Sequence, residues 1–217
     1  MVDRARLADA LDRLAGARVA VIGDVMLDRY VYGEADRISP EAPVPVLRVR
    51  EESEMLGGAG NVLRNLAALG VNAACLAAVG DDGKRVADLL AREPGVSAHI
   101  VTAAGRTTIR KTRFVAGGHQ LLRVDRERAE PLPPAAERQA AAAVAAALAG
   151  AGAVVLSDYG KGLLSATVIA AILAAAARLG IPVLADPKGR DFAKYRGAAL
   201  VTPNRKELGE AAGRVVF

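Results

Sequence analysis

The sequence contains no tryptophan, a single cysteine and two histidines, and aromatic residues make up only 3% of its 217 residues. One cysteine excludes both a disulfide framework and a zinc site built on cysteines. Cys75 lies within an apolar run, so we expect a small buried side chain rather than a nucleophile. His99 and His119 have no acid or thiol at metal-ligand spacing, and we assign neither a catalytic role. With so few aromatic residues, the core must be aliphatic.

The net charge and its distribution along the sequence indicate which kinds of ligand the protein can bind. A net charge of +5 and a pI near 9.6 suggest anionic ligands. Arginine is scattered between apolar segments and aromatic residues are too sparse to stack on bases, so we expect phosphorylated small molecules and no nucleic acid. No apolar run approaches the roughly 20 residues of a transmembrane helix, and charged residues interrupt positions 1–17. We therefore expect a cytoplasmic protein with no membrane partner.

Apolar runs and helical patterns alternate regularly along the chain. Buried strands are predicted over 18–24, 73–79, 153–157, 181–185 and 198–201, and helices over 6–14, 56–69, 84–90, 135–148, 165–179 and after Asn204. This alternation predicts an α/β fold with a mostly parallel sheet and helices on both faces. Short strands with partly polar faces are predicted over 100–101, 107–115 and 120–124. The alternating strands near 44–50 and 107–124 do not fit the layer of the parallel sheet. They predict a small accessory sheet beside the main one.

A glycine-rich segment, Gly57-Gly58-Ala59-Gly60-Asn61, opens one of the predicted helices. Glycines there let backbone N–H groups approach a ligand, and Asn61 offers both a donor and an acceptor to a polyol. The alternative is a glycine-rich turn without a ligand. The segment is not a dinucleotide fingerprint, because Leu63 stands where G-x-G-x-x-G needs its third glycine. No stretch of the sequence matches a P-loop.

Acidic and basic residues follow three of the predicted strands. Asp24 follows the first, Asp158 and Lys161 follow the strand over 153–157, and Asp186 and Lys188 follow the strand over 181–185. Ligands of α/β proteins bind beyond the carboxyl ends of parallel strands. Both lysines lie beside glycines, where an ammonium group can reach a phosphate. The alternative is a set of solvated turns, which explains one such strand end more easily than two.

Asn204 and Glu207 stand three residues apart at the start of the last predicted helix. This spacing places the two side chains on one face of the first turn, compatible with a hydrated Mg²⁺ ion beside phosphates. A helix N-cap with a capping-box glutamate explains the same pair fully. From these residues alone we favour the cap.

Taken in order, these segments resemble the PfkB/ribokinase family of sugar kinases. The glycine-rich segment resembles the family's first signature, and Asn204-x-x-Glu207 resembles its Asn-x-x-Glu motif. Longer stretches resemble the heptose-7-phosphate kinases of the ADP-heptose pathway: GDVMLDRY (23–30), RISPEAPVPVLRV (37–49), KTRFVAGGHQLLRVD (111–125), DYGKG (158–162) and DPKG (186–189). The resemblance implies one domain over 1–217, a three-layer α/β/α ribokinase-like sandwich with a small β lid. It also implies ATP-dependent phosphorylation of the C1 hydroxyl of a heptose 7-phosphate.

The resemblance further implies roles for single residues. The residues matched to sugar binding are Asp24, Gly57, Gly58 and Asn61, with Lys111, Arg113, Gln120, Arg123, Asp158 and Lys161 as further substrate-side candidates. The residues matched to Mg²⁺–ATP are Asp186, Lys188, Asn204 and Glu207, with Glu207 as the metal ligand. Such a transfer needs positioning and charge neutralisation more than covalent chemistry.

The family's Gly-Ala-Gly-Asp segment, which carries its catalytic Asp, is matched by nothing after Glu207. We therefore expect the general base to lie beyond residue 217 and the chain alone to be inactive. The lid strands are candidates for pairing between the subunits of a homodimer. The alternatives to this kinase are a sugar-phosphate-binding protein without catalysis and a PfkB kinase for another sugar phosphate, such as fructose 6-phosphate.

Overall fold

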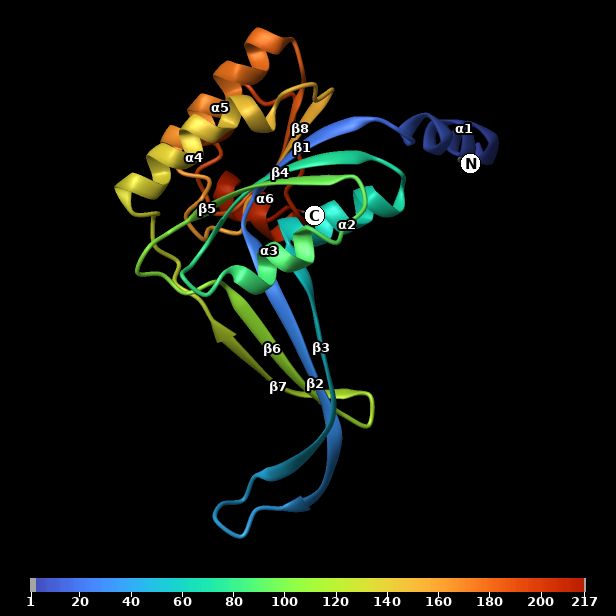
Figure 1. Ribbon diagram of the computed structural model, residues 1–217, viewed down its shortest axis with the longest axis vertical. Coiled ribbons are helices and arrows are strands. Elements are labelled where there is room, and N and C mark those ends of the chain that lie inside the picture. Colours follow the sequence, from blue (N-terminus) through green and yellow to red (C-terminus); the bar gives the residue numbers. More distant parts are fainter. Residues whose placement is uncertain (1–2, 217) are drawn as a thin grey trace.

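The computed structural model describes residues 3–216 and folds them around two sheets (Figure 1). The larger sheet has six strands in the order β10-β9-β8-β1-β4-β5, and all neighbouring strands in it run parallel. Its strands are β1 (Arg18–Gly23), β4 (Asn72–Val79), β5 (Val96–Thr102), β8 (Ala153–Ser157), β9 (Val183–Asp186) and β10 (Leu200–Val201). The predicted parallel sheet is confirmed.

Helices cover both faces of this sheet. α4 (Pro134–Ala147) and α5 (Ala166–Leu179) pack on one face, and α2 (Ala59–Ala68) and α3 (Lys84–Leu90) pack on the other (Figure 1). Successive strand residues point to opposite faces. Accordingly Ala20 and Ile22 of β1 join the core with α4 and α5, whereas Val21 joins the core with α2 and α3. The expected three-layer α/β/α sandwich is confirmed.

The smaller sheet forms the lid. Its strand order is β3-β2-β6-β7, from β2 (Val25–Ile38), β3 (Pro45–Gly58), β6 (Arg110–Ala116) and β7 (His119–Arg126). β2 and β3 form a long antiparallel hairpin that extends away from the sandwich, and β6 runs parallel to β2 (Figure 1). Because β2 starts directly after Asp24, the chain passes from the core sheet into the lid at this residue.

The lid also holds the main departures from the predicted elements. No strand is predicted over 25–38, where polar residues interrupt the alternation and pairing with both β3 and β6 supplies the order. The predicted strand over 44–50 continues to Gly58, because residues 56–58 pair with residues 25–27. The helix predicted from residue 56 therefore begins at Ala59. The short strand expected at 100–101 is part of β5 at the edge of the core sheet.

The burial of Cys75 agrees with its predicted role. The side chain is fully buried in the core with α2 and α3. Burial raises the pKa of the Cys75 thiol to about 12, so this residue is a packing group and not a nucleophile.

The remaining elements lie near the two ends of the chain. α1 (Arg4–Leu14) projects from the sandwich and none of its residues is buried (Figure 1). The short helix η1 (Ala193–Tyr195) precedes β10, and α6 (Arg205–Ala212) follows it. Within residues 3–216, no helix combines the length and the apolar character needed to cross a membrane.

Candidate active site

The predicted acids at the strand ends lie side by side. In the core sheet Gly23 pairs with Ser157, and Ser157 pairs with Asp186. Asp24 and Asp158 are the residues that follow β1 and β8, so three acids from distant segments meet at one sheet edge. This is the edge at which parallel α/β sheets bind ligands.

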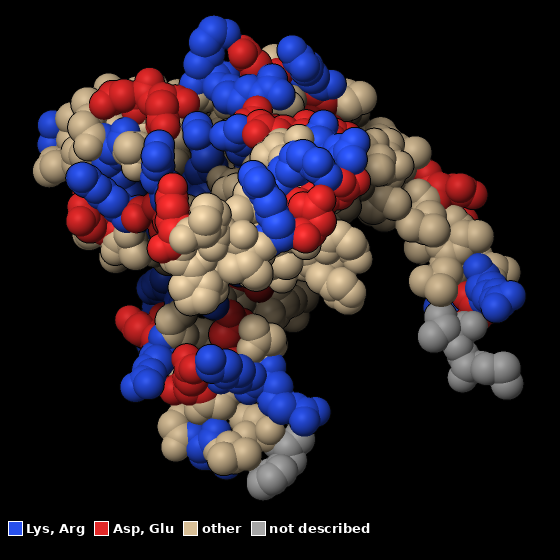
Figure 2. Space-filling model, turned by 90° about the horizontal axis from the view of Figure 1, so that it is seen from below, with Lys and Arg blue, Asp and Glu red and all other residues tan. Residues whose placement is uncertain are grey.

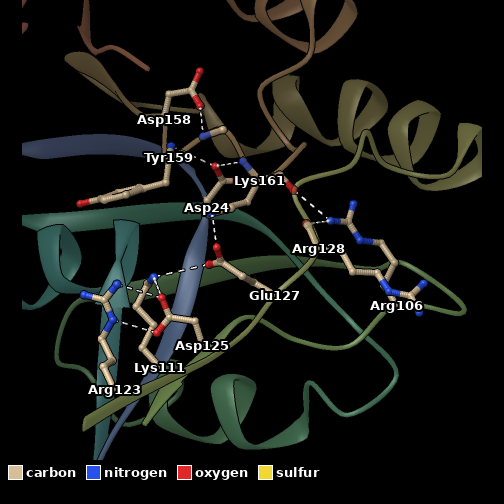
Figure 3. Close-up of polar contacts among 11 residues, drawn as sticks. Asp24, Arg106, Lys111, Arg123, Asp125, Glu127, Arg128, Asp158, Tyr159 and Lys161 are labelled. Carbon is tan, nitrogen blue, oxygen red and sulfur yellow. Dashed lines mark hydrogen bonds and ion pairs between the residues drawn. The ribbon is translucent and has the colours of Figure 1, made fainter. Parts of the chain in front are cut away.

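Asp24 fixes the loop that follows β8. The residue is 3% exposed, and its carboxylate accepts hydrogen bonds from the backbone N–H groups of Tyr159 and Lys161, both at 3.0 Å (Figure 3). A third N–H, that of Leu163, lies 3.4 Å away. Burial raises the pKa of the Asp24 carboxyl, and the bonds from Lys161 and Tyr159 oppose that rise. In this structure the Asp24 carboxylate, which the family resemblance matched to sugar binding, holds the loop carrying Lys161.

Three predicted basic residues meet at the junction of lid and core, each with an acidic partner (Figure 3). Lys161 Nζ donates to Glu127 Oε1 at 2.6 Å. Lys111 Nζ, from β6, lies 3.2 Å from Asp125 Oδ2 and 3.4 Å from Glu127 Oε2. Arg123, from β7, binds both carboxylate oxygens of Asp125. The hydrogen bond from Lys161 lowers the pKa of Glu127, so this acid is ionised beside its lysines at neutral pH.

Arg106 is a residue of this site that the sequence did not indicate. Its guanidinium donates to four backbone carbonyls, those of Arg128, Glu130, Pro131 and Lys161. The first three belong to the segment that leaves the lid after β7. Arg106 therefore ties the exit of the lid to the Lys161 loop (Figure 3).

Asp158 is occupied by the chain itself. Its side chain is 2% exposed, and Oδ2 accepts from Lys194 Nζ at 2.7 Å and from the Tyr195 hydroxyl at 2.6 Å. The same hydroxyl accepts from the Lys188 N–H at 3.2 Å. Tyr195 thus links the loops that follow β8 and β9. Nothing in the local sequence marked Lys194 or Tyr195, because their partners lie on other strands.

At two positions of the predicted signature, neighbouring atoms lie so close to the backbone that only glycine fits. A Cβ atom at Gly57 would lie 2.4 Å from Asp28 Oδ2, and one at Gly58 would lie 2.3 Å from the Asp24 carbonyl oxygen. Gly58 also has a φ of +58°. Arg113 donates to Asp28 at 2.7 Å, so this predicted substrate-side cation is paired beside the glycines. The glycines let the lid hairpin cross the end of β1.

Asn61 and Gln120 are both exposed and lie outside these clusters. Asn61 borders a cavity of about 370 Å³ that α2 forms with the segment at Glu93. Gln120 lies at the start of β7 and pairs with Val115, toward the far end of that strand from Asp125. Neither residue is brought to the Lys161 cluster in this structure, and their assigned roles stay predictions.

The predicted nucleotide-side residues form a second cluster. Asn204 caps α6, and its side chain and that of Glu207 make the reciprocal bonds of a capping box, as favoured from the sequence. Glu207 also accepts from Lys188 Nζ at 3.0 Å. Burial of Glu207 opposes ionisation, but the bonds from Asn204 and Lys188 lower its pKa. Burial, and then the nearby charge of Glu207, raise the pKa of Asp186.

These residues fit a hydrated Mg²⁺ ion. Magnesium in nucleotide sites takes one or two carboxylates and completes its octahedron with water and phosphate oxygens. Asp186 and Glu207 supply two neighbouring carboxylates of that kind. Within residues 3–216, no group of three or more histidine, cysteine, aspartate and glutamate side chains is placed to hold a metal on its own.

The surface charge follows the same paired pattern. Figure 2 shows lysine and arginine side chains interspersed with aspartate and glutamate over one face of the molecule. The basic residues on that face do not gather into a continuous stripe. This distribution suits local recognition of a small anion better than tracking of a phosphate backbone.

Comparison with solved structures places this arrangement in a known fold. The phosphofructokinase-2 of Escherichia coli, solved with substrates and products, superposes with a TM-score of 0.73 at 25% identity, over 93% of this chain and 64% of that one. The ribokinase of Arabidopsis thaliana, solved with ribose and ATP, gives a TM-score of 0.61 at 19% identity, over 91% and 63% of the two chains. The ribokinase-like fold is confirmed.

Sequence comparison gives more similar relatives. The bifunctional protein HldE of Hyphomonas neptunium is 50% identical over 213 residues, 97% of this chain and 44% of the relative. HldE of Caulobacter vibrioides is 51% identical over 213 residues, 95% of this chain and 44% of the relative. The chain thus spans less than half the length of these relatives. The family model for pfkB family carbohydrate kinases matches residues 17–215, and the chain belongs to this family.

Proposed function

We propose that this chain is the sugar-binding part of an ATP-dependent kinase in ADP-heptose biosynthesis. The reaction transfers the γ-phosphoryl group of ATP to the C1 hydroxyl of D-glycero-D-manno-heptose 7-phosphate, giving the 1,7-bisphosphate. The support is the identity of about half of all aligned positions with proteins named HldE. The segments over 37–49 and 111–125, which resemble heptose-7-phosphate kinases, contribute to the lid that lies beside the site.

The observation that carries this proposal is the meeting of Lys111, Arg123 and Lys161 beside the end of β1 (Figure 3). Lys111 and Arg123 come from the lid and Lys161 from the core. Because these cations come from both the lid and the core, they are suited to bind an anionic substrate that brings the two parts together. A sugar phosphate supplies both hydroxyls and the anion.

The nucleotide would lie at the second cluster. Lys188 reaches the end of β9 and stays protonated, because its hydrogen bond to Glu207 raises its pKa. In the proposed complex this ammonium group would orient the phosphates of ATP, and Asp186 and Glu207 would hold Mg²⁺. Bound there, Mg²⁺ would neutralise charge on the phosphate oxygens. The capping box fixes Glu207 at the start of α6 and so fixes the direction of its carboxylate.

We also propose that the 217-residue chain does not turn over by itself. The sequence contains no Gly-Ala-Gly-Asp segment of the kind that carries the family's catalytic Asp. The two buried acids at the strand ends are already engaged, Asp24 by backbone N–H groups and Asp158 by Tyr195 and Lys194. A base that must accept the C1 proton needs an available lone pair beside the sugar.

Ligand binding tests the substrate assignment on the chain as it stands. We expect heptose 7-phosphate to raise the melting temperature more than fructose 6-phosphate or ribose does. Lys161→Gln should abolish most of this gain, and Lys84→Gln, on an exposed lysine of α3, should leave it unchanged. A larger effect of fructose 6-phosphate would favour the second candidate, a phosphofructokinase, which the TM-score of 0.73 to phosphofructokinase-2 supports.

Turnover is tested separately by phosphorus NMR with the chain, ATP, Mg²⁺ and heptose 7-phosphate. We expect no 1,7-bisphosphate signal. Its appearance would contradict the proposal that this chain does not turn over by itself. Binding of heptose 7-phosphate without any response to ATP would favour the third candidate, a sugar-phosphate-binding protein without catalysis.

The lid is the surface that we propose for a homodimer. β3 and β7 are the edge strands of its sheet. On β7, Leu122 is 57% exposed and Val124 is 48% exposed. Light scattering should give twice the monomer mass, and Leu122→Lys should return the protein to a monomer; a wild-type monomer would contradict the pairing.

A further inference from the structure

Glu127 stands where the lid and the core meet. It follows β7 directly, and one of its carboxylate oxygens contacts the core while the other lies near the lid. Oε1 accepts from Lys161 Nζ of the core loop at 2.6 Å, and Oε2 lies 3.4 Å from Lys111 Nζ of the lid strand β6. The side chains of the two lysines are only 16% and 18% exposed, and that of Glu127 is 24% exposed. One carboxylate therefore bridges two lysines that are largely shielded from water (Figure 3).

Lys161 is fixed at three points. Its backbone N–H donates to Asp24, its carbonyl accepts from Arg106, and its ammonium group donates to Glu127. The first two bonds set the position of the loop and would persist if the ammonium group changed partner. The bond to Glu127 is the one of the three that a ligand can replace without unfolding the loop.

We propose that Glu127 is a specificity-determining residue: an internal counterion that the phosphate group of a substrate must displace from Lys111 and Lys161. The proposal deepens the function proposed above and rests on it, because it concerns how that same site selects a phosphorylated sugar. A neutral sugar hydroxyl cannot compete with a carboxylate for two ammonium groups. A phosphate dianion can, since it brings two charges and three acceptor oxygens.

The charges of the cluster agree with this role. Lys111, Arg123 and Lys161 carry three positive charges against the two negative charges of Asp125 and Glu127. The remaining positive charge attracts an anion, while each cation keeps a partner when no anion is present. Lysines left unpaired in this shielded place would repel each other and carry a desolvation cost.

A small cavity lies beside Asp24 and Lys161. The cavity that these two residues share with Arg106 and Thr108 has a volume of about 20 Å³. That volume holds one water molecule and no sugar. Glu127 and Lys111 do not line this cavity, so the bridge between the lid and the core loop lies outside it.

The test compares the phosphate affinity of two variants with the same change in charge. Glu127→Gln removes the counterion but keeps the size of the side chain. Glu130→Gln lies three residues further along the same linker, where the side chain is exposed. Inorganic phosphate is titrated into each protein while the backbone amides of Lys161 and of position 127 are followed by NMR. We expect E127Q to bind phosphate about tenfold more tightly than the wild type, from the removal of one unit charge near the anion. E130Q should change the affinity by less than about twofold.

An unchanged or weaker phosphate affinity in E127Q would overturn the proposal, since Glu127 would then merely support the lysines. Folding of each variant is checked by circular dichroism. Should E127Q fail to fold, Glu127→Asp provides the same test, because it withdraws the carboxylate by one methylene from Lys161. We expect E127D to bind phosphate more tightly than the wild type, and no gain would overturn the proposal. These titrations need no sugar, so a failure of heptose 7-phosphate to bind would contradict the proposed function and leave this result standing.

Discussion

Replacing Tyr195 with phenylalanine removes one hydroxyl group from the connection between the loops after β8 and β9. That hydroxyl donates to Asp158 Oδ2 at 2.6 Å and accepts from the Lys188 N–H at 3.2 Å. The tyrosine is 2% exposed, so water cannot replace either bond without entering the core. Phenylalanine fills the same space otherwise, which means that the cost comes from hydrogen bonding and not from a cavity.

The cost follows from the types of bond that are lost. A hydrogen bond to a charged group contributes about 1.5–3 kcal/mol, and a neutral one about 1 kcal/mol. Asp158 keeps its bonds from Lys194 and from the Gly160 N–H, which reduces the penalty on its carboxylate. We therefore expect Tyr195→Phe to lower the free energy of unfolding by about 2–3 kcal/mol. For a chain of this length that corresponds to a fall in Tm of about 4–12 °C.

Urea denaturation followed by circular dichroism measures this loss. The matched control is Tyr32→Phe, because Tyr32 is 37% exposed on the lid and should change the stability by less than about 0.5 kcal/mol. A loss below about 0.5 kcal/mol in Tyr195→Phe itself would refute the reasoning. It would mean that the two loops are held together by the packing of the ring and by Lys194, and that the hydroxyl adds nothing.

Three further substitutions test other contacts. Gly58→Ala should lower the free energy of unfolding by at least about 2 kcal/mol, because φ is +58° and the new Cβ would lie 2.3 Å from a carbonyl oxygen. The control Gly118→Ala, at a φ of +78° with open space around it, should lower it by about 1 kcal/mol. Equal losses in urea denaturation would contradict the clash at Gly58. In Arg106→Lys the single ammonium group cannot bind four carbonyls, so amide hydrogen exchange should be faster over residues 128–131 and 159–163. Unchanged protection there would contradict the role of Arg106 in joining these two segments. Because the pKa of Glu127 is lowered in the folded protein, its ion pair stabilises the fold fully above about pH 5, and this stabilisation is lost as the pH falls. Glu127→Gln should therefore flatten the decline of the free energy of unfolding between about pH 5 and pH 3. An unaltered slope would show that the pair with Lys161 adds no stability.

The core of the fold was predictable because its signals are local. Parallel strands buried on both faces are continuous apolar runs, and the runs over 18–24, 73–79 and 153–157 became β1, β4 and β8. The lid was predicted less well. β2 has charged and small residues along its outer half and gains its order from β3 on one side and β6 on the other. No window of sequence contains those pairings, so periodicity alone could not show them.

The candidate site divides in the same way. Asp24, Asp158 and Lys161 were found because each follows a recognisable strand, and position at a strand end is a local property. Arg106 was not found, because its acceptors lie between 22 and 55 residues further along the chain. Glu127 was missed for the same reason, since its lysine partners are on β6 and on the loop after β8. Groups at the ends of recognisable strands can be found in the sequence, whereas groups defined by partners far along the chain are visible only in the fold.

The acidic and the basic residues of the site have different roles. Three acids of the site are used within the protein: Asp24 holds a loop, Asp158 holds Tyr195 and Lys194, and the half-buried Glu127 holds Lys161. The groups that these acids position are mainly cations. Preorganised cations stabilise developing negative charge without reorganising during the reaction, and this is the contribution that phosphoryl transfer needs most. On the function proposed above, the described part of the chain would receive and orient an anionic substrate, and a base other than these engaged acids would take the proton from the sugar hydroxyl.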